Sequence, residues 1–88
     1  PLPAVCELTL PLVRSGGKAV LLKGPSVRAE VPDGRAAARV IGGGELELIE
    51  ARLAGGERRV IVVVPKTGQT PAEYPRRSGV PQRRPIKQ

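Results

Sequence analysis

The sequence predicts an α/β fold in which a mainly parallel sheet ends in an antiparallel hairpin, followed by an extended basic tail. Residues 19–22 and 60–64 are continuous apolar runs, whereas residues 45–48 alternate strictly between glutamate and leucine. Continuous runs suit strands that are covered on both faces, and alternation suits a strand with one face in water. Five prolines between residues 65 and 85 predict the tail, because proline interrupts helices and sheets.

The start of the chain predicts a helix and then a buried strand. Apolar residues three to four positions apart in residues 3–14 share one helical face, and Cys6 is expected to be a small buried group within it. Pro11 should kink this helix or begin a short final turn. Gly16-Gly17 then end it, and residues 18–23 form the strand. This arrangement is half of an α/β unit.

The middle of the chain is less regular. Residues 26–40 predict two short helical pieces, interrupted by the turn signal Pro-Asp-Gly at 32–34. The three glycines at 42–44 predict a flexible joint. Residues 49–53 break the alternation of the preceding strand, which predicts a bulge or an edge position.

The second half predicts a hairpin whose two strands differ in burial. Residues 54–57, Ala-Gly-Gly-Glu, form a hairpin-type turn between the alternating segment and the run at 60–64. The alternating strand should lie at the edge and the apolar strand inside the sheet, next to residues 18–23. This order is that of the terminal half of a Rossmann-like sheet.

Composition excludes several functional classes. The chain has 88 residues, no His, one Cys and a single aromatic residue, Tyr74. A disulfide framework, a Cys/His zinc site and the usual His-containing catalytic triads are therefore excluded. No apolar run approaches a membrane span and no signal pattern opens the chain, so a reducing cytosol is expected. The abrupt start at Pro1 predicts a piece of a larger protein.

The positive charge is concentrated in the tail. The net charge is +7, and residues 64–88 have six Lys or Arg side chains but one acid, which leaves little excess charge in residues 1–63. Arginine is the commoner basic residue, and guanidinium groups suit phosphates and base edges. A basic tail of this kind favours nucleic-acid binding and a merely solvated tail about equally.

Three motifs resemble one protein family. Residues 66–86 match the ending K-x-x-x-T-P-x-x-Y-P-R-R-x-G-x-P-x-x-x-P-[LI], and residues 7–24 match E-x-x-L-P-x-x-x-x-G-G followed by K-G. Residues 56–63 are similar to a G-E-R-x-x-V-V strand. These motifs resemble the family first called glucose-inhibited division protein B, whose members are S-adenosylmethionine-dependent methyltransferases. They act on N7 of a guanine in small-subunit ribosomal RNA. The resemblance spans nearly the whole chain, but only the C-terminal half of a family member.

The resemblance implies a division of labour. Residues 1–64 would be the C-terminal part of a Rossmann-like class I methyltransferase domain, and residues 65–88 a basic proline-rich tail. S-adenosylmethionine would be held by residues upstream of Pro1, because the family's glycine-rich loop is not in this chain. Residues 42–44 are no substitute, since they precede a strand rather than a helix. The fragment alone should be inactive, and the whole protein should modify ribosomal RNA in the cytoplasm.

The resemblance also implies a set of substrate-binding residues. The RNA-binding candidates are Lys23, Arg58, Lys66, Tyr74, Arg76 and Arg77. No catalytic residue, cofactor ligand or metal ligand is predicted. The residues themselves leave alternatives open: Lys23 as an ordinary strand-end lysine, Arg58 in a salt bridge with Glu57 or Glu50, Arg76 and Arg77 as groups that pin the tail. For Tyr74, docking of the tail is favoured over stacking on a base.

A rival interpretation comes from another functional class. The chain could be a freestanding small RNA-binding or ribosome-associated protein with a basic tail. That interpretation predicts steeply salt-dependent RNA binding by this chain alone. A third possibility is a truncated chain without activity.

Overall fold

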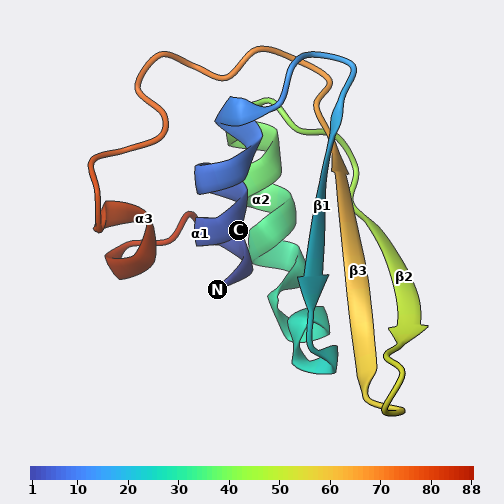
Figure 1. Cartoon of the computed structure of the whole chain (residues 1–88). Helices are drawn as coiled ribbons and strands as arrows, with labels where there is room; N and C mark the ends of the chain where they lie inside the picture. Colours follow the sequence, from blue (N-terminus) through green and yellow to red (C-terminus); the bar gives the residue numbers. More distant parts are fainter.

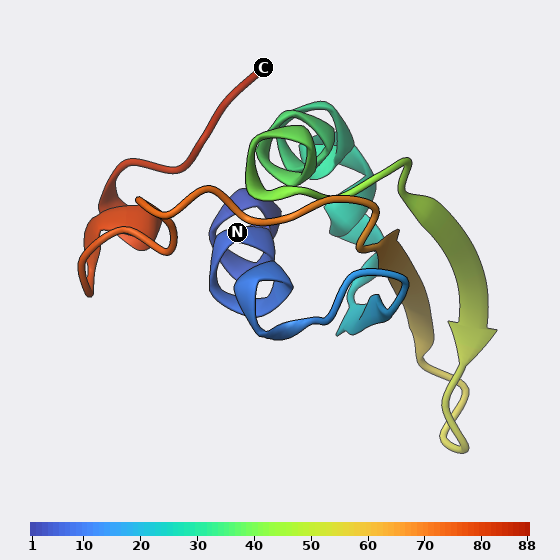
Figure 2. The ribbon, with the colours of Figure 1, turned by 90° about the horizontal axis from the view of Figure 1, so that it is seen from above.

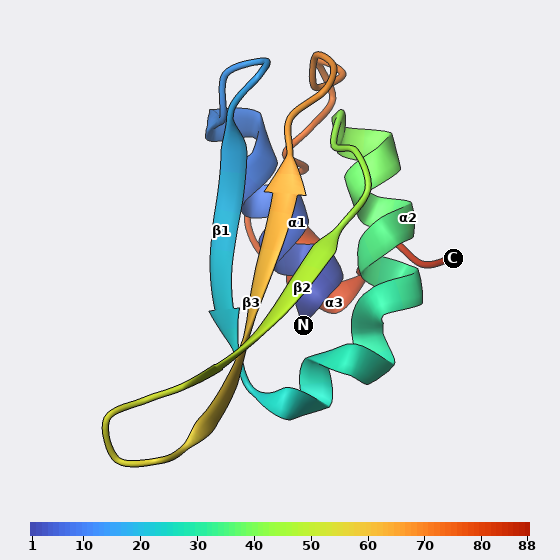
Figure 3. The ribbon, with the colours of Figure 1, turned by 90° about the vertical axis from the view of Figure 1, so that its right-hand side faces the viewer.

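The computed structural model describes residues 1–88 and places the helices on one face of a three-stranded sheet (Figures 1 and 3). The helices are α1 (Leu2–Thr9), α2 (Val31–Ile41) and α3 (Val80–Arg83), and the strands are β1 (Lys18–Lys23), β2 (Glu47–Arg52) and β3 (Arg58–Pro65). Two 3₁₀ turns, η1 (Leu10–Leu12) and η2 (Pro25–Glu30), follow α1 and precede α2. The chain is therefore a small α/β unit with an open sheet.

The strand order is β1-β3-β2, and β3 is antiparallel to both of its neighbours. In the register, Val20 lies opposite Val63 and Ile49 lies opposite Ile61. β1 and β2 run in the same direction but do not pair, so every strand pair in this chain is antiparallel and the predicted mainly parallel sheet is not formed by these residues. A turn closed by Gly56, at φ +89°, joins β2 to β3. The predicted hairpin, and the insertion of its second strand beside residues 18–23, are confirmed. Of the predicted bulge or edge position, the edge position is confirmed: β2 is an edge strand, and residues 47–52 pair regularly without a bulge.

The helical segments follow the prolines. Pro11 lies in η1, so the predicted short final turn of the first helix is confirmed. The break predicted at residues 32–34 is wrong: these residues form the first turn of α2, where Pro32 needs no hydrogen-bond partner and Asp33 faces the positive end of the helix dipole. Gly34 permits close packing on α1, since a Cβ there would overlap the side chain of Leu2.

The glycines at 42–44 form a packed crossing point rather than the predicted flexible joint. Gly42 ends α2 at φ +103°, and its carbonyl accepts hydrogen bonds from the N–H groups of Thr67 and Gly68, both at 3.0 Å. A Cβ on Gly43 would lie 3.1 Å from atoms of Ala38, Leu10 and Val64. A Cβ on Gly42 would lie 2.8 Å from the carbonyl oxygens of Gly68 and Gln69, so glycine is required where these two backbone segments approach closely.

The two faces of the sheet have different surroundings. On the inner face, Val60, Val62 and Val64 are buried against α1 and α2. On the outer face, Val20 is 66% exposed and Leu22 is 59% exposed. The expectation that residues 18–23 are covered on both faces is therefore wrong for this chain, because it supplies only one layer of helices.

The tail is docked along the helices and does not extend into solvent (Figure 2). It passes the end of α2, where the Thr70 hydroxyl donates to the Ile41 carbonyl at 2.7 Å, and then follows the side of α1 that faces away from the sheet. The N–H of Gln88 finally donates to Asp33 at 2.9 Å. The prediction that prolines forbid helix here is wrong for α3, which begins with Pro81 in its first turn.

Candidate functional site

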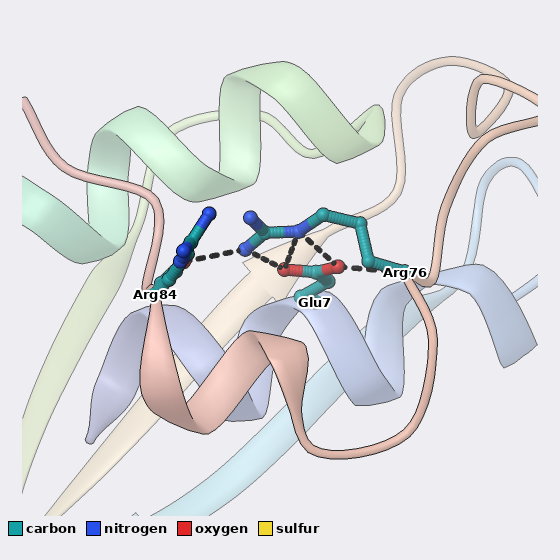
Figure 4. Close-up of polar contacts among 3 residues, drawn as sticks. All are labelled: Glu7, Arg76 and Arg84. Atoms are coloured by element: carbon teal, nitrogen blue, oxygen red, sulfur yellow. Dashed lines mark hydrogen bonds and ion pairs between the residues drawn. The ribbon is translucent and has the colours of Figure 1, made fainter.

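The tail is fixed to α1 by one buried carboxylate. Glu7 is fully buried, and both of its oxygens accept hydrogen bonds from Arg76 (Figure 4). The closest contact joins Arg76 Nη2 to Glu7 Oε1 at 2.7 Å, and the backbone N–H of Arg76 donates to Oε2 at 2.8 Å. The same Nη2 also donates to the Arg84 carbonyl at 2.8 Å. Glu7 thus holds the tail before α3, and its partner Arg76 also holds the backbone that follows α3.

The charges of this pair stabilise each other. The Arg76 guanidinium, through its side-chain hydrogen bonds, lowers the pKa of Glu7, and this effect exceeds the opposing effect of burial. Glu7 in turn raises the pKa of Arg76. Both groups are therefore charged at neutral pH. Arg76, a predicted RNA ligand, takes the role of pinning the tail in this structure.

Lys66 is also directed inward. It is 4% exposed, and its ammonium donates to the carbonyls of Leu10 at 2.7 Å and Val13 at 2.8 Å. These carbonyls lie at the end of the first helical segment, where the Leu10 carbonyl also accepts the N–H of Val13 at 3.0 Å. The predicted role of Lys66 as an RNA ligand does not agree with this placement, because the ammonium caps a helix and is buried away from solvent.

Tyr74 belongs to the docked tail as well. Its ring packs against the hydrophobic core, together with Ile86 further along the tail. Docking, the favoured alternative for Tyr74, agrees with this placement. The burial of Cys6 in α1 is confirmed: burial raises the pKa of its thiol to about 11, although the charge of Lys23 opposes the shift.

Lys23 and Arg58 lie at the opposite end of the molecule from the start of the tail. β1 ends at Lys23 and β3 begins at Arg58, at the same end of the sheet (Figure 1). Arg58 lies 3.9 Å from Glu50, which is also 3.5 Å from Arg28. The salt bridge with Glu50, one of the alternatives for Arg58, is thus formed. These two candidates are not brought together with the tail candidates.

Of the predicted tail candidates, Arg77 alone is both basic and exposed. It lines a cavity of about 420 Å³ with Val80, Arg83 and Arg84. Arg83 and Arg84 were not predicted as site residues, although the pair repeats the Arg-Arg step of residues 76–77. No pattern in the sequence indicated α3, the short helix that brings Arg83 and the following Arg84 to the cavity that Arg77 lines.

The residues present do not build a site for S-adenosylmethionine. The space beside the glycines at 42–44, where a cofactor could approach the backbone, is occupied by neighbouring backbone and side chains. The cavity beside α3 is lined by cationic groups, which do not suit a positively charged sulfonium. No three acidic or cysteine side chains gather where a metal ion could be held. None of the helices has both the length and the apolar character needed to cross a membrane.

Comparison with known proteins identifies clear relatives. The chain is 44% identical to the Ribosomal RNA small subunit methyltransferase G of Deinococcus radiodurans, over 97% of this chain and 34% of that protein. The proteins of the same name from Pelotomaculum thermopropionicum and Lactobacillus acidophilus are 41% and 43% identical, over 97% and 91% of this chain. No protein-family model matches.

These matches confirm the resemblance found in the motifs. The chain spans about a third of the length of the curated relatives it matches, which is less than the half that the motifs indicated.

Proposed function

We propose that this chain is the C-terminal third of an S-adenosylmethionine-dependent methyltransferase that modifies N7 of a guanine in small-subunit ribosomal RNA. The observation that carries the proposal is the similarity of nearly the whole chain to about a third of enzymes named for this substrate. The whole enzyme would act in the cytoplasm, where ribosomal RNA is found, and the fragment would be inactive alone.

The bare sheet face supports this assignment. Val20 and Leu22 on β1 and Ile49 on β2 are exposed apolar side chains on one face, and β1 has no partner along its outer edge. Exposed apolar faces and open edges are costly for a protein that functions alone. The remaining two thirds of the enzyme would pair with β1 and cover this face, which would complete a Rossmann-like sheet.

The proposed chemistry makes modest demands on side chains. N7 of guanine has an available lone pair, so its methylation needs no general base, and the main requirements are alignment and electrostatic support. The target base must also be exposed to reach a pocket. In this division of labour the methyl donor is held outside the chain, and residues 1–88 anchor the RNA.

The residue roles follow from exposure. We assign RNA contact to Arg77 on the tail and to Lys23 and Arg58 at the end of the sheet. Arg76, Lys66 and Tyr74 would act indirectly, since their contacts with Glu7, with helix carbonyls and with the core hold the tail in place. The domain boundary predicted at residues 64 and 65 would then separate two parts that share one packed core.

A hybrid enzyme tests the proposal. The first two thirds of the D. radiodurans relative would be joined to this chain and expressed in a strain that lacks its own enzyme. Nucleosides from small-subunit ribosomal RNA would then be analysed by mass spectrometry. We expect 7-methylguanosine to be restored by the hybrid, and to be absent with either part alone.

Two outcomes would contradict the proposal. A hybrid that folds and binds S-adenosylmethionine but leaves the RNA unmethylated would refute the assigned role. Micromolar binding of S-adenosylmethionine by residues 1–88 alone would refute the division of labour. Tight RNA binding by the separate chain, combined with an inactive hybrid, would favour the freestanding RNA-binding protein.

A further inference from the structure

Three arginines meet at one place on the tail without an acidic partner. Arg77, Arg83 and Arg84 line the cavity of about 420 Å³. All of the ion pairs in the chain involve other arginines: Arg28, Arg35, Arg58 and Arg76. The cavity therefore has a concentrated positive charge that the protein itself leaves uncompensated.

The local backbone builds this cluster. Gly79, at φ +86°, starts α3, a conformation that residues other than glycine rarely adopt. α3 ends at Arg83, and the N–H of Arg84, the next residue, donates to the Val80 carbonyl at 2.8 Å, which keeps Arg84 against the end of α3. The Arg77 carbonyl accepts the N–H of Val80 at 3.0 Å, which places Arg77 beside the start of α3. Buried Pro81 fixes α3.

The buried ion pair of Glu7 and Arg76 holds the backbone at the end of the cluster, and its acid does not neutralise the cluster. Arg76 donates to the Arg84 carbonyl, so the ion pair between Glu7 of α1 and Arg76 also fixes the backbone at the end of α3 (Figure 4). Both carboxylate oxygens of Glu7 accept hydrogen bonds from Arg76 and are therefore not available to the other arginines. Three neighbouring guanidinium groups repel one another, and a bound anion would relieve that repulsion.

We propose that this cavity binds backbone phosphates of the RNA substrate, without reading its bases. This inference rests on the proposed function, which supplies the RNA. Val80 is the one apolar residue of the lining, and the chain's only aromatic side chain, Tyr74, packs against the core, so the cavity offers no aromatic surface for base stacking. Guanidinium groups match phosphate oxygens in geometry and charge.

The salt dependence of RNA binding tests the site. Binding of a fluorescein-labelled single-stranded oligoribonucleotide would be followed by anisotropy as NaCl is raised from about 50 to about 200 mM. Each phosphate contact on a single strand contributes about 0.7 to the slope of log K against log salt, so the variant R77Q/R83Q/R84Q should lose about 2 from the slope. The control R14Q/R39Q/R52Q removes the same charge elsewhere and should keep the slope.

The results separate this site from the proposed function. An equal loss of slope in both variants would overturn the cavity and leave a diffuse basic surface. Displacement of the RNA by micromolar inorganic pyrophosphate would instead indicate a site for small phosphorylated ligands, and would also overturn it. The assay involves no methyl transfer, so an inactive hybrid leaves its result intact. If circular dichroism shows that residues 1–88 do not fold separately, both variants would be compared in the hybrid.

Discussion

The two faces of the sheet contrast sharply. The inner face is covered by α1 and α2, and the tail then covers the far side of α1, so valines such as Val62 are fully buried (Figure 2). The outer face has nothing above it, and Val20 is 66% exposed. Identical residue types on one sheet thus occupy opposite environments. Under the proposed function, this chain would complete one side of a domain and leave the other side to the rest of the enzyme.

On the covered side of the sheet, the substitution expected to lower the free energy of unfolding most is Arg76→Ala. It leaves the buried carboxylate of Glu7 without its cationic partner, and loss of one member of a buried pair costs about 3 kcal/mol. We expect the free energy of unfolding to fall by about that amount, as measured by urea denaturation. Because the chain has no Trp and one Tyr, the fluorescence of Tyr74 reports on the tail directly.

The neighbouring arginine supplies the matched control. Arg77 is exposed and forms no ion pair, so Arg77→Ala should change the free energy of unfolding by no more than about 0.5 kcal/mol. Equal effects of the two substitutions would mean that the Glu7 contact does not hold the tail.

Low pH should weaken the contact between Glu7 and Arg76 without a mutation, and the loss of stability should be smaller than that caused by Arg76→Ala. The pKa of Glu7 is lowered in the folded state, so its contribution to stability is present above the unfolded-state value and is lost as the pH falls through the folded-state value. We therefore expect Tyr74 fluorescence to report release of the tail below about pH 4.5. The variant Glu7→Gln should lack this transition. A transition that persists in the variant would assign it to another carboxylate.

Lys66 tests the upper end of the covered side. Lys66→Met keeps the length of the side chain but removes the ammonium that donates to two carbonyls, so the Leu10 carbonyl keeps only the N–H of Val13 and the Val13 carbonyl loses its donor. Unsatisfied buried acceptors cost about 1–3 kcal/mol, and we expect thermal unfolding by circular dichroism to shift accordingly. Lys87→Met removes an exposed lysine from the same tail and should be close to neutral. A neutral Lys66→Met would restore Lys66 as a candidate RNA ligand.

The sheet was predictable from the sequence because its signals are local. The apolar run at residues 18–23 and the turn at 54–57 fixed the strands and the hairpin, and the difference in burial pattern placed the second hairpin strand inside. The coverage of the strands was not predictable in the same way. An apolar run records the burial that a strand requires, and it does not tell which chain segment provides the cover.

The site was predictable in composition and poorly predictable in geometry. The excess charge of the tail was evident, but its basic residues divide into buried, paired and free groups through contacts far apart in sequence. Glu7 and Arg76 are 69 positions apart, and the ammonium of Lys66 reaches a carbonyl 56 positions away. No local pattern marks such pairs. The cluster of Arg77, Arg83 and Arg84 also depended on a helix that the prolines concealed.

The smallest expected change in the free energy of unfolding is on the exposed outer face of the sheet. Making the same Val→Thr substitution on both faces measures the difference between them. Val62→Thr keeps the side-chain volume nearly unchanged but buries a hydroxyl in place of a methyl group, and it should lower the free energy of unfolding by about 1–3 kcal/mol. Val20→Thr places that hydroxyl on an exposed position and should change it by no more than about 0.5 kcal/mol. In the hybrid enzyme the missing two thirds should cover Val20, so there Val20→Thr should become as costly as Val62→Thr. If Val20→Thr is neutral in the hybrid as well, the outer face stays in solvent, and the idea that it is an internal surface of a larger domain is wrong.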